Sequence, residues 1–227
     1  MNTNLRIGDV LKEKGYVTDE QMNQALAYQK EHRDMRVGQI LRELGFVTEE
    51  QVLDALASRL QLRIVDVAAE LPGAAEFTEK ASKLCTVSIA HTDCMYEEAC
   101  AVFDAGASHL THLYNAMPGI HHRKPGPIGA GSERENVVAE LICDGQHIHP
   151  SAVRMAFKLF PGRICLISDA LRCCGMPDGQ YTLGGQDVWL ENNLARLADG
   201  TIAGSATNLY LCMQKAISFG IPMEQAI

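Results

Sequence analysis

The sequence lacks any apolar run that approaches the roughly 18 residues needed for a membrane span. Its first residues, MNTNLRIGDVLKEKG, hold no apolar segment followed by a cleavage site, so we expect no signal peptide. Basic residues are in deficit, and the net charge of −8 argues against a general nucleic-acid-binding surface. The eight cysteines form no C-x-x-C motif, and several lie in apolar runs, where cysteine acts as a small buried hydrophobe. We therefore expect a cytoplasmic protein with reduced thiols.

A tandem repeat occupies the first part of the chain. Residues 6–29 align without gaps on residues 36–59, and 12 of the 24 aligned positions are identical. Each copy predicts two helices, with a glycine that ends the first and a T-x-x-Q capping box that begins the second. A short strand at residues 62–67 is expected to close the unit. The pattern indicates a small helical tandem-repeat domain over residues 1–67.

Beyond residue 68 the pattern changes to short apolar runs that alternate with helical segments. The runs are rich in β-branched residues and lie at residues 85–91, 109–114, 137–145 and 163–170. Strands that alternate with helices predict a parallel sheet covered by helices. A hairpin excursion at residues 181–205 and a last helix at about 206–219 are expected to follow. The predicted fold class is therefore α/β, with a second domain over residues 69–227.

Polar residues cluster at the carboxyl ends of these predicted strands. His91, His112 and Asp169 end three of them, and His147 follows the fourth. The same end of the strands holds the active site in α/β barrels. Neutral imidazoles suit zinc or iron, and an aspartate beside the metal can take a proton from water. The alternative is that each histidine is a hydrogen-bonded core or surface residue.

Five segments resemble one enzyme family in their order and spacing. They are AHTD, THLYNAMPGIHHRKPG, ICDGQHIHP, LISDALRCCGMPDGQY and DGTIAGS. Over about residues 69–227 the chain resembles the N-acetylglucosamine-6-phosphate deacetylases, which are (β/α)₈ barrels of the amidohydrolase superfamily. The resemblance implies hydrolysis of N-acetylglucosamine 6-phosphate to glucosamine 6-phosphate and acetate. It also implies a divalent metal cofactor, zinc or iron.

The resemblance assigns roles to particular residues. His91 and His112 correspond to metal ligands, Asp169 to the general base, and His147 to the histidine that contacts the sugar. Substrate phosphate is assigned to Arg123, which usually reaches across a dimer interface, and to the backbone N–H groups of Asn115 and Ala116. A guanidinium together with backbone donors suits a phosphate dianion.

Two parts of the family pattern are not found. There is no H-x-H pair before His91, and no ligating glutamate that follows a third strand. The resemblance therefore implies half of a barrel, strands five to eight, whose catalytic competence is in doubt and whose zinc binding is expected to be weak. Strands five and eight would have open edges, so we expect a homo-oligomer.

The repeat resembles the N-terminal domain of type II secretion and type IV pilus ATPases. Some of these bind cyclic di-GMP through tandem R-L-G-x-x-L-x-x-x-G motifs, which implies a possible nucleotide site here at Arg6, Gly8, Gln29, Arg36 and Gly38. Ile7, Val37 and Arg59 depart from the motif. A structural or protein-docking repeat is equally open. The second functional hypothesis is thus a non-catalytic binding protein that uses the repeat for cyclic di-GMP or a protein partner.

Overall fold

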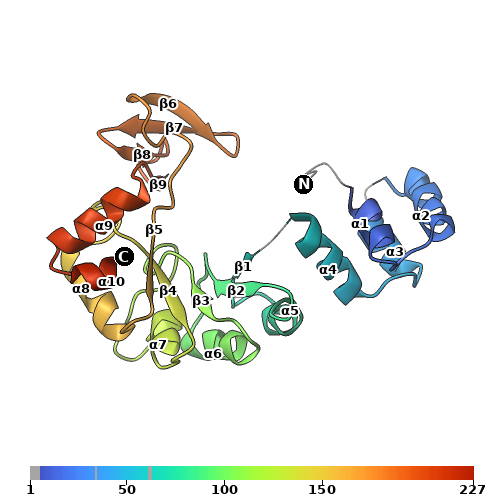
Figure 1. Ribbon diagram of the computed structural model, residues 1–227, viewed down its shortest axis with the longest axis horizontal. Helices are drawn as coiled ribbons and strands as arrows, with labels where there is room; N and C mark the ends of the chain where they lie inside the picture. Colours follow the sequence, from blue (N-terminus) through green and yellow to red (C-terminus); the bar gives the residue numbers. More distant parts are fainter. Residues whose placement is uncertain (1–5, 34, 61–62) are drawn as a thin grey trace. The chain divides into compact units, whose positions relative to one another are not determined.

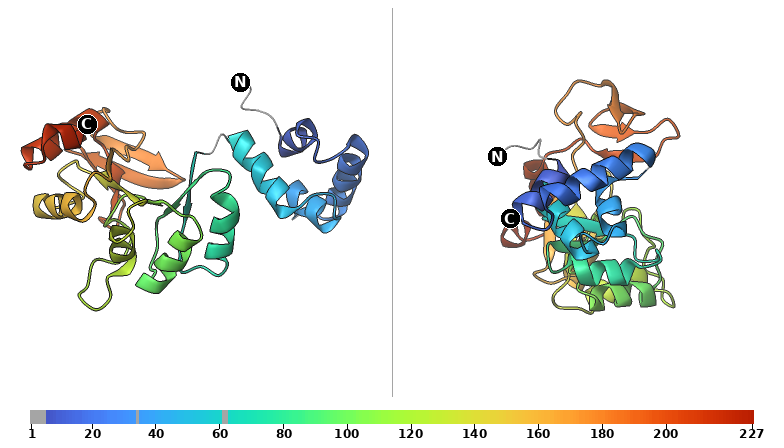
Figure 2. Two further views of the ribbon diagram at one scale, coloured as in Figure 1. Left: turned by 60° about the horizontal axis from the view of Figure 1, so that its bottom comes forward. Right: turned by 90° about the vertical axis from the view of Figure 1, so that its right-hand side faces the viewer.

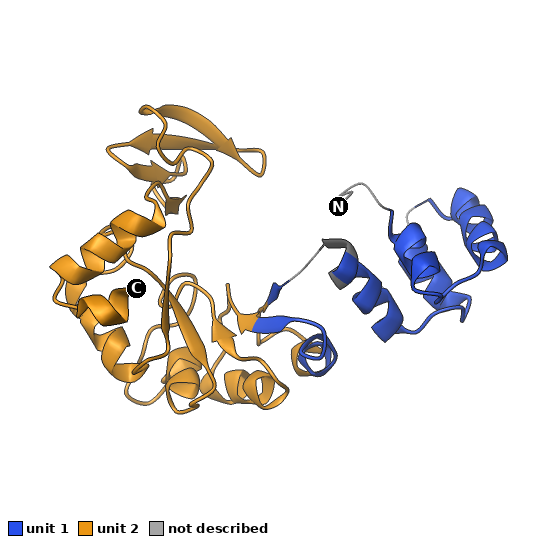
Figure 3. Cartoon of the chain, in the orientation of Figure 1, with its two compact units in different colours: residues 1–65, 76–87 blue, residues 66–75, 88–227 orange. Residues whose placement is uncertain are grey.

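The computed structural model describes residues 6–33, 35–60 and 63–227 (Figure 1). The chain divides into two compact units, residues 1–65 with 76–87 and residues 66–75 with 88–227 (Figure 3). The domain boundary between residues 67 and 69 stays a prediction. Within the described ranges no helix is both long and apolar enough to span a membrane.

Four helices make up the repeat region. They are α1 (Ile7–Glu13), α2 (Asp19–Glu31), α3 (Val37–Glu43) and α4 (Glu49–Leu60). The predicted capping boxes are present in both copies. The Thr18 N–H donates to Gln21 Oε1 at 2.9 Å, and the Gln21 N–H donates to Thr18 Oγ1 at 3.2 Å. Thr48 and Gln51 repeat the two bonds at the same distances. Each box satisfies N–H groups that have no partner inside the helix.

The helices of the repeat region bury an apolar cluster of their own. Its buried members are Val10, Leu11, Val17, Met22, Ala25, Ile40, Leu41, Val47 and Ala55. Gly8 and Gly38 lie where helices approach closely. A Cβ atom added to Gly8 would lie 3.0 Å from Met22 Cε, and one added to Gly38 would lie 3.2 Å from Val52 Cγ1. Packing therefore explains both repeated glycines without a ligand.

A five-stranded sheet forms the centre of the second region. Its strands are β1 (Ile64–Val67), β2 (Thr86–Ile89), β3 (His109–Leu110), β4 (Val138–Ile142) and β5 (Ile164–Ile167), in the spatial order β1-β2-β3-β4-β5. Strands β2 to β5 pair in parallel. The predicted parallel α/β sheet is confirmed. That it forms half of a (β/α)₈ barrel stays a prediction.

Strand β1 corrects two of the expectations. Residues 62–67 were expected to close the helical repeat, but Thr86 N–H donates to Arg63 O at 2.9 Å and Ala90 N–H donates to Val67 O at 3.1 Å. The segment therefore joins the sheet, apart from residue 62, which lies outside the described residues. The strand at residues 85–91 is consequently not an edge strand. The edges of the sheet are β1 and β5.

Helices connect the strands. They are α5 (Ala74–Ala81), α6 (Tyr96–Asp104), α7 (Gly126–Ser132) and α8 (Pro150–Leu159). Helices α6, α7 and α8 lie around the outer side of strands β3 to β5 (Figure 2). A Cβ atom on Gly131 of α7 would lie 2.6 Å from Leu110 Cδ1, so the glycine lets α7 pack closely on β3. Leu110 thus faces the helices.

The opposite face of the sheet carries polar side chains, which we call the polar face: Asp66, Ser88, Thr111 and Glu140. Thr111 Oγ1 donates to Asp66 Oδ1 at 2.8 Å and lies 2.7 Å from Ser88 Oγ. The pairing of Leu110 with Ala139 sets Thr111 beside Glu140. Because neighbours along a strand point to opposite faces, Thr111 and Leu110 look in opposite directions.

An antiparallel sheet follows β5, as the hairpin prediction requires. Its strands are β6 (Gly179–Leu183), β7 (Gln186–Glu191), β8 (Leu194–Arg196) and β9 (Ile202–Ser205). Ala170 forms a bridge with Ser205, so this sheet is attached directly after β5. The predicted last helix is α9 (Leu209–Ser218), which begins after the Asn208 N-cap, and α10 (Met223–Ala226) follows.

The separate apolar cluster predicts that residues 1–63 fold alone. The fragment should give a helical circular-dichroism spectrum and a cooperative melt, because its helices bury their apolar faces against each other. Leu41 is fully buried, and Leu41→Ala should lower the free energy of unfolding by about 2–5 kcal/mol. Leu26 is 43% exposed, so the matched Leu26→Ala control should cost less than about 1 kcal/mol. A disordered fragment, or equal losses in both variants, would contradict this prediction.

Candidate metal and substrate site

Three of the predicted site residues share one backbone feature. His91, His112 and Asp169 each lie two residues beyond the last residue of β2, β3 and β5, and their φ angles are 45°, 34° and 45°. Positive φ is uncommon for residues other than glycine and costs about 1–3 kcal/mol. Such outliers gather at functional sites because the surrounding structure must enforce them. The backbone therefore bends in the same way after each of the three strands, at the same end of the sheet.

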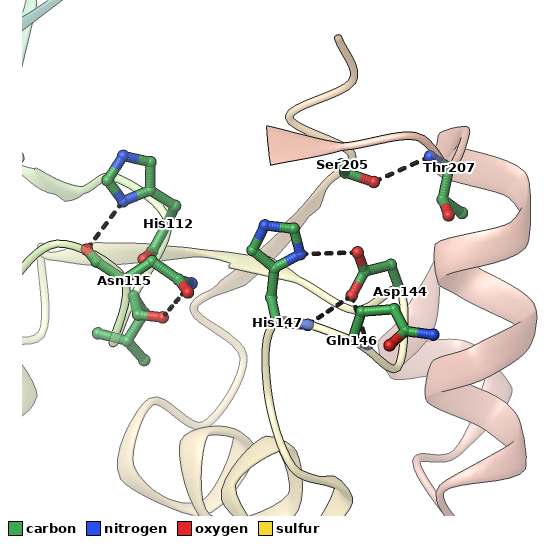
Figure 4. Close-up of polar contacts among 8 residues, drawn as sticks. His112, Asn115, Asp144, Gln146, His147, Ser205 and Thr207 are labelled. Atoms are coloured by element: carbon green, nitrogen blue, oxygen red, sulfur yellow. Dashed lines mark hydrogen bonds and ion pairs between the residues drawn. The ribbon is translucent and has the colours of Figure 1, made fainter. Parts of the chain in front are cut away.

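The bends bring His91 and His112 together. Their Nε2 atoms lie 3.0 Å apart, with the ring planes at 89°. The second ring nitrogen of His112, Nδ1, lies 3.1 Å from the carbonyl oxygen of Asn115 (Figure 4). A carbonyl can only accept, so His112 Nδ1 carries the proton and Nε2 offers its lone pair toward His91. This arrangement is typical of an imidazole that binds a metal.

The two imidazoles fit a divalent metal in part. Nitrogen donors that converge on one point suit zinc or iron, and a catalytic zinc site normally has three protein ligands. Among residues 6–33, 35–60 and 63–227, no group of three or more His, Cys, Asp or Glu side chains is placed to hold a metal. Asp169 therefore does not complete a set of three. The pair supplies two ligands of a site that needs more.

Asp169 is held by the antiparallel sheet. Its carbonyl oxygen accepts from the Ser205 N–H at 3.1 Å, and the Ser205 carbonyl accepts from the Leu171 N–H at 2.8 Å. Its side chain is exposed and influences Glu140 of the polar face. Burial, with the charges of Asp66 and Asp169, raises the pKa of Glu140. Sequence reasoning missed Glu140 because it lies inside the apolar run VVAELICDG.

The backbone groups of Asn115 and Ala116, which were predicted to bind phosphate, form hydrogen bonds within the chain. The Asn115 N–H donates to the His112 carbonyl at 2.9 Å. The Ala116 carbonyl accepts from the Thr92 N–H at 3.0 Å, and Ala116 has a φ of 49°. These bonds fix the loop after β3 against the loop after β2. A phosphate role for Asn115 would require its N–H to change partner, so the assignment stays a prediction.

Arg123 lies apart from the imidazole pair. It is exposed, and its Nη1 lies 2.6 Å from His122 Nε2. It lines a cavity of about 470 Å³ with Met95, Tyr96, Glu97, Lys124, Pro125 and Glu133. Neither His91 nor His112 lines this cavity. The structure of one chain thus does not bring Arg123 to the predicted site, and its contact with phosphate remains a prediction that involves a second subunit.

His147 is held by a residue that sequence reasoning missed. His147 Nδ1 lies 2.7 Å from Asp144 Oδ2, and both side chains are buried (Figure 4). Burial alone would raise the pKa of Asp144. The hydrogen bonds from the His147 ring and from the His147 and Gln146 N–H groups outweigh burial and lower the pKa to about 2. The D-G-Q-H order was the available signal, because aspartate before glycine favours a turn closed by its own side chain.

The possible nucleotide residues of the repeat have contacts within the helical unit. The N–H groups of Arg6 and Arg36 donate to Asp9 Oδ2 at 3.1 Å and to Gln39 Oε1 at 3.0 Å, at the starts of α1 and α3. Gln29 Nε2 donates to the Met35 carbonyl at 2.9 Å. Gly8 and Gly38 pack as described above. Nucleotide binding therefore stays a prediction.

A parallel α/β sheet with paired imidazoles at its carboxyl end is a layout found in hydrolases, and comparisons with known proteins name deacetylases. No family model matches. The N-acetylgalactosamine-6-phosphate deacetylase of Escherichia coli O157:H7 is 37% identical over 172 residues, 75% of this chain and 46% of that protein. The N-acetylglucosamine-6-phosphate deacetylase of Bacillus subtilis (strain 168) is 48% identical over 120 residues, 52% of this chain and 30% of that protein.

A shorter relative and two solved structures extend the match. A protein of E. coli (strain K12), provisionally named N-acetylgalactosamine-6-phosphate deacetylase, is 40% identical over 117 residues, 51% of this chain and 70% of its own. A Mycobacterium smegmatis N-acetyl-D-glucosamine-6-phosphate deacetylase variant in complex with N-acetyl-D-glucosamine-6-phosphate has a TM-score of 0.73 at 32% identity, covering 79% of this chain and 49% of that one. The Thermotoga maritima enzyme has a TM-score of 0.72 at 28% identity, covering 79% and 50%.

The chain belongs to the N-acetylglucosamine-6-phosphate deacetylase family, whose named members are hydrolases. It spans less than half the length of the first two relatives named above, at 46% and 30%. These matches give no support to the resemblance of residues 1–67 to secretion ATPases, which stays a prediction.

The low pKa of Asp144 predicts a pH-dependent share of stability. A folded-state pKa of about 2 lies below the ordinary value of 3.8, so the ionised carboxylate stabilises the fold above about pH 4. That share, about 2 kcal/mol, should be lost as the pH falls from about 4 to 2. Asp144→Asn should lack it. Denaturant titrations at several pH values should show the difference between wild type and variant shrinking toward pH 2. A difference independent of pH would refute the prediction.

Proposed function

We propose that this chain carries part of the active site of a deacetylase that acts on N-acetylglucosamine 6-phosphate in the cytoplasm. The reaction is hydrolysis of the acetamide, which gives glucosamine 6-phosphate and acetate. The observation that carries the proposal is the His91–His112 pair, whose Nε2 atoms meet at 3.0 Å at the carboxyl end of the sheet. Family membership supports the substrate class, since the relatives are named for N-acetylated hexosamine 6-phosphates.

His91 and His112 would hold a zinc or iron ion, which supplies an activated water at neutral pH. Asp169 would take a proton from a water molecule that adds to the acetamide carbonyl. When the C–N bond breaks, Asp169 returns the proton to the amine nitrogen, so acetate and the amino sugar leave. His147 contacts the sugar, and Arg123 binds the 6-phosphate with the N–H groups of Asn115 and Ala116.

The sheet would be the second half of a (β/α)₈ barrel, to which β1 adds a strand. Its edge strands β1 and β5 are the places where further strands would pair. Beside β5 lies an apolar groove of about 540 Å³ whose lining includes Ile164, Leu166, Tyr210, Met213 and Ile227. An open edge beside an apolar groove favours association with a second copy of the chain.

The base assignment predicts a separation of metal binding from turnover. Asp169→Asn should reduce turnover at least about 100-fold, because a general base contributes about 10²–10⁴-fold. Metal content, measured by elemental analysis, should stay close to wild type, since no primary ligand is removed. His91→Ala should reduce both. Release of amine from N-acetylglucosamine 6-phosphate and from its galacto isomer measures activity.

Two matched controls make this test specific. Asp178→Asn and His149→Ala change the same residue types at exposed positions. Asp178 accepts from the Asn192 N–H and His149 is the N-cap of α8, so both side chains have local structural contacts, and neither change should alter metal content per folded chain or turnover. Equal activity of wild type and Asp169→Asn would refute the base. Wild-type chain that takes up no zinc or iron and releases no amine would refute the proposed function.

The open edges predict self-association. At micromolar concentration, light scattering should give a mass of at least twice 24.8 kDa. Cys165 is exposed on edge strand β5, and Cys165→Lys should shift the mass toward the monomer by adding charge to this edge. Cys100→Lys on helix α6, away from the edge, is the control and should leave the mass unchanged. A monomeric wild type would rule the association out.

A further inference from the structure

The loop after β4 contains a buried carboxylate that the proposed chemistry does not use. The Asp144 side chain is 1% exposed, and it contacts His147, whose side chain is 6% exposed. A buried charge is expensive unless it is fully hydrogen-bonded. The hydrogen-bond partners of Asp144 therefore indicate the role of this charge.

Both oxygens of Asp144 accept hydrogen bonds from the same loop. Oδ1 accepts from the Gln146 N–H at 2.8 Å and from the His147 N–H at 3.0 Å, while Oδ2 lies 2.7 Å from His147 Nδ1 (Figure 4). Gly145, with a φ of 82°, turns the backbone so that both N–H groups point back at the carboxylate. The loop and the imidazole are thus fixed by one side chain.

An ionised carboxylate can only accept, so His147 Nδ1 must carry a proton. In the neutral ring the proton-free nitrogen is then Nε2, which points away from Asp144 (Figure 4). The titratable groups that face the pair are Cys143 at the end of β4, and Cys212 and Lys215 of α9. Burial raises the pKa of both thiols, so they stay protonated, and none of the three accepts from the ring.

We propose that Asp144 is a positioning residue that fixes the Nδ1–H tautomer of His147 and thereby presents Nε2 as a hydrogen-bond acceptor for a hydroxyl group of the sugar. The substrate part of this proposal rests on the proposed function. The tautomer part does not, because it follows from the contacts of Asp144 alone. The two can therefore fail separately.

An asparagine at position 144 gives a sharp test. Its carbonyl oxygen can keep both backbone N–H bonds, which places its NH₂ group against His147 Nδ1. The NH₂ group donates, so the ring must accept at Nδ1 and carry its proton on Nε2. The same inversion of tautomer explains the effect of an Asp→Asn change in the serine-protease triad. Asp144→Asn should thus invert the tautomer with little change in shape.

The measurement is a long-range ¹H–¹⁵N spectrum of the histidine rings in the full-length chain, recorded at alkaline pH, with the His147 signals identified by their loss in His147→Gln. Wild type should show a protonated Nδ1 and a proton-free Nε2, and Asp144→Asn should show the reverse. The control is Asp199→Asn. Asp199 accepts the N–H of Thr201 two residues on, as Asp144 does with Gln146, but has no histidine partner. It should leave His147 unchanged.

A wild-type His147 with its proton on Nε2 would overturn the proposal, and this result needs no variant to fold. An unchanged tautomer in a folded Asp144→Asn would overturn it too. In the assay with N-acetylglucosamine 6-phosphate, Asp144→Asn should lower kcat/KM about tenfold, mainly through KM, because Nε2 then carries a proton and the sugar hydroxyl can no longer donate to it but must reorient to accept. An inverted tautomer with unchanged kcat/KM would refute the substrate role. An inactive wild type with the expected tautomer would refute the proposed function and leave the positioning role intact.

Discussion

The candidate site depends on a left-handed bend directly after three strands of the parallel sheet. Each bend costs energy, since His91, His112 and Asp169 all carry a Cβ. Hydrogen bonds on the far side of each bend hold it in place. Thr92 N–H donates to Ala116 O, Leu113 N–H donates to Glu140 O at 2.7 Å, and Leu171 N–H donates to Ser205 O. The chain thus leaves each strand, bends once and is immediately bonded to a neighbouring element. Without those bonds the backbone would continue in the direction of each strand, and the imidazoles of His91 and His112 would not lie in contact.

A structural feature could be predicted from the sequence when the residues that form it lie close together along the chain. The capping boxes at Thr18 and Thr48 were predictable because all their atoms lie within four residues. Strand β1 was assigned wrongly because its partner, β2, lies about twenty residues further on, and nothing in R-I-V-D-V separates a strand that closes a helical unit from one that joins a sheet. The parallel sheet itself was recovered from the alternation of apolar runs and helices.

The residues of the candidate site also divide into those that the sequence could predict and those that it could not. The meeting of His91 and His112 follows from parallel strands ending at one edge, which a sequence can show. Their positive φ angles cannot be read from the residue types, because only a small minority of histidines and aspartates adopt a positive φ. Asp144 was passed over because D-G reads first as a turn, and its burial beside an imidazole depends on the packing of α9. Arg123 shows a different dependence, since the family motif assigns it to a phosphate across a subunit interface, and in its own chain it lies on an exposed loop, so its role stays a prediction.

The polar face sets the charge around the proposed base. Parallel sheets normally bury apolar residues on both faces, yet here one face packs on α7 through Leu110 and the other carries Asp66, Thr111 and Glu140. The Thr111 hydroxyl donates a hydrogen bond to Asp66 Oδ1 at 2.8 Å. Glu140, buried and close to the charges of Asp66 and Asp169, has a raised pKa. As the pH falls, a proton taken up by Glu140 removes a repelling charge from beside Asp169. Asp169 is therefore exposed at the end of a face whose buried carboxyl group, Glu140, gives up its proton less readily than an ordinary glutamate.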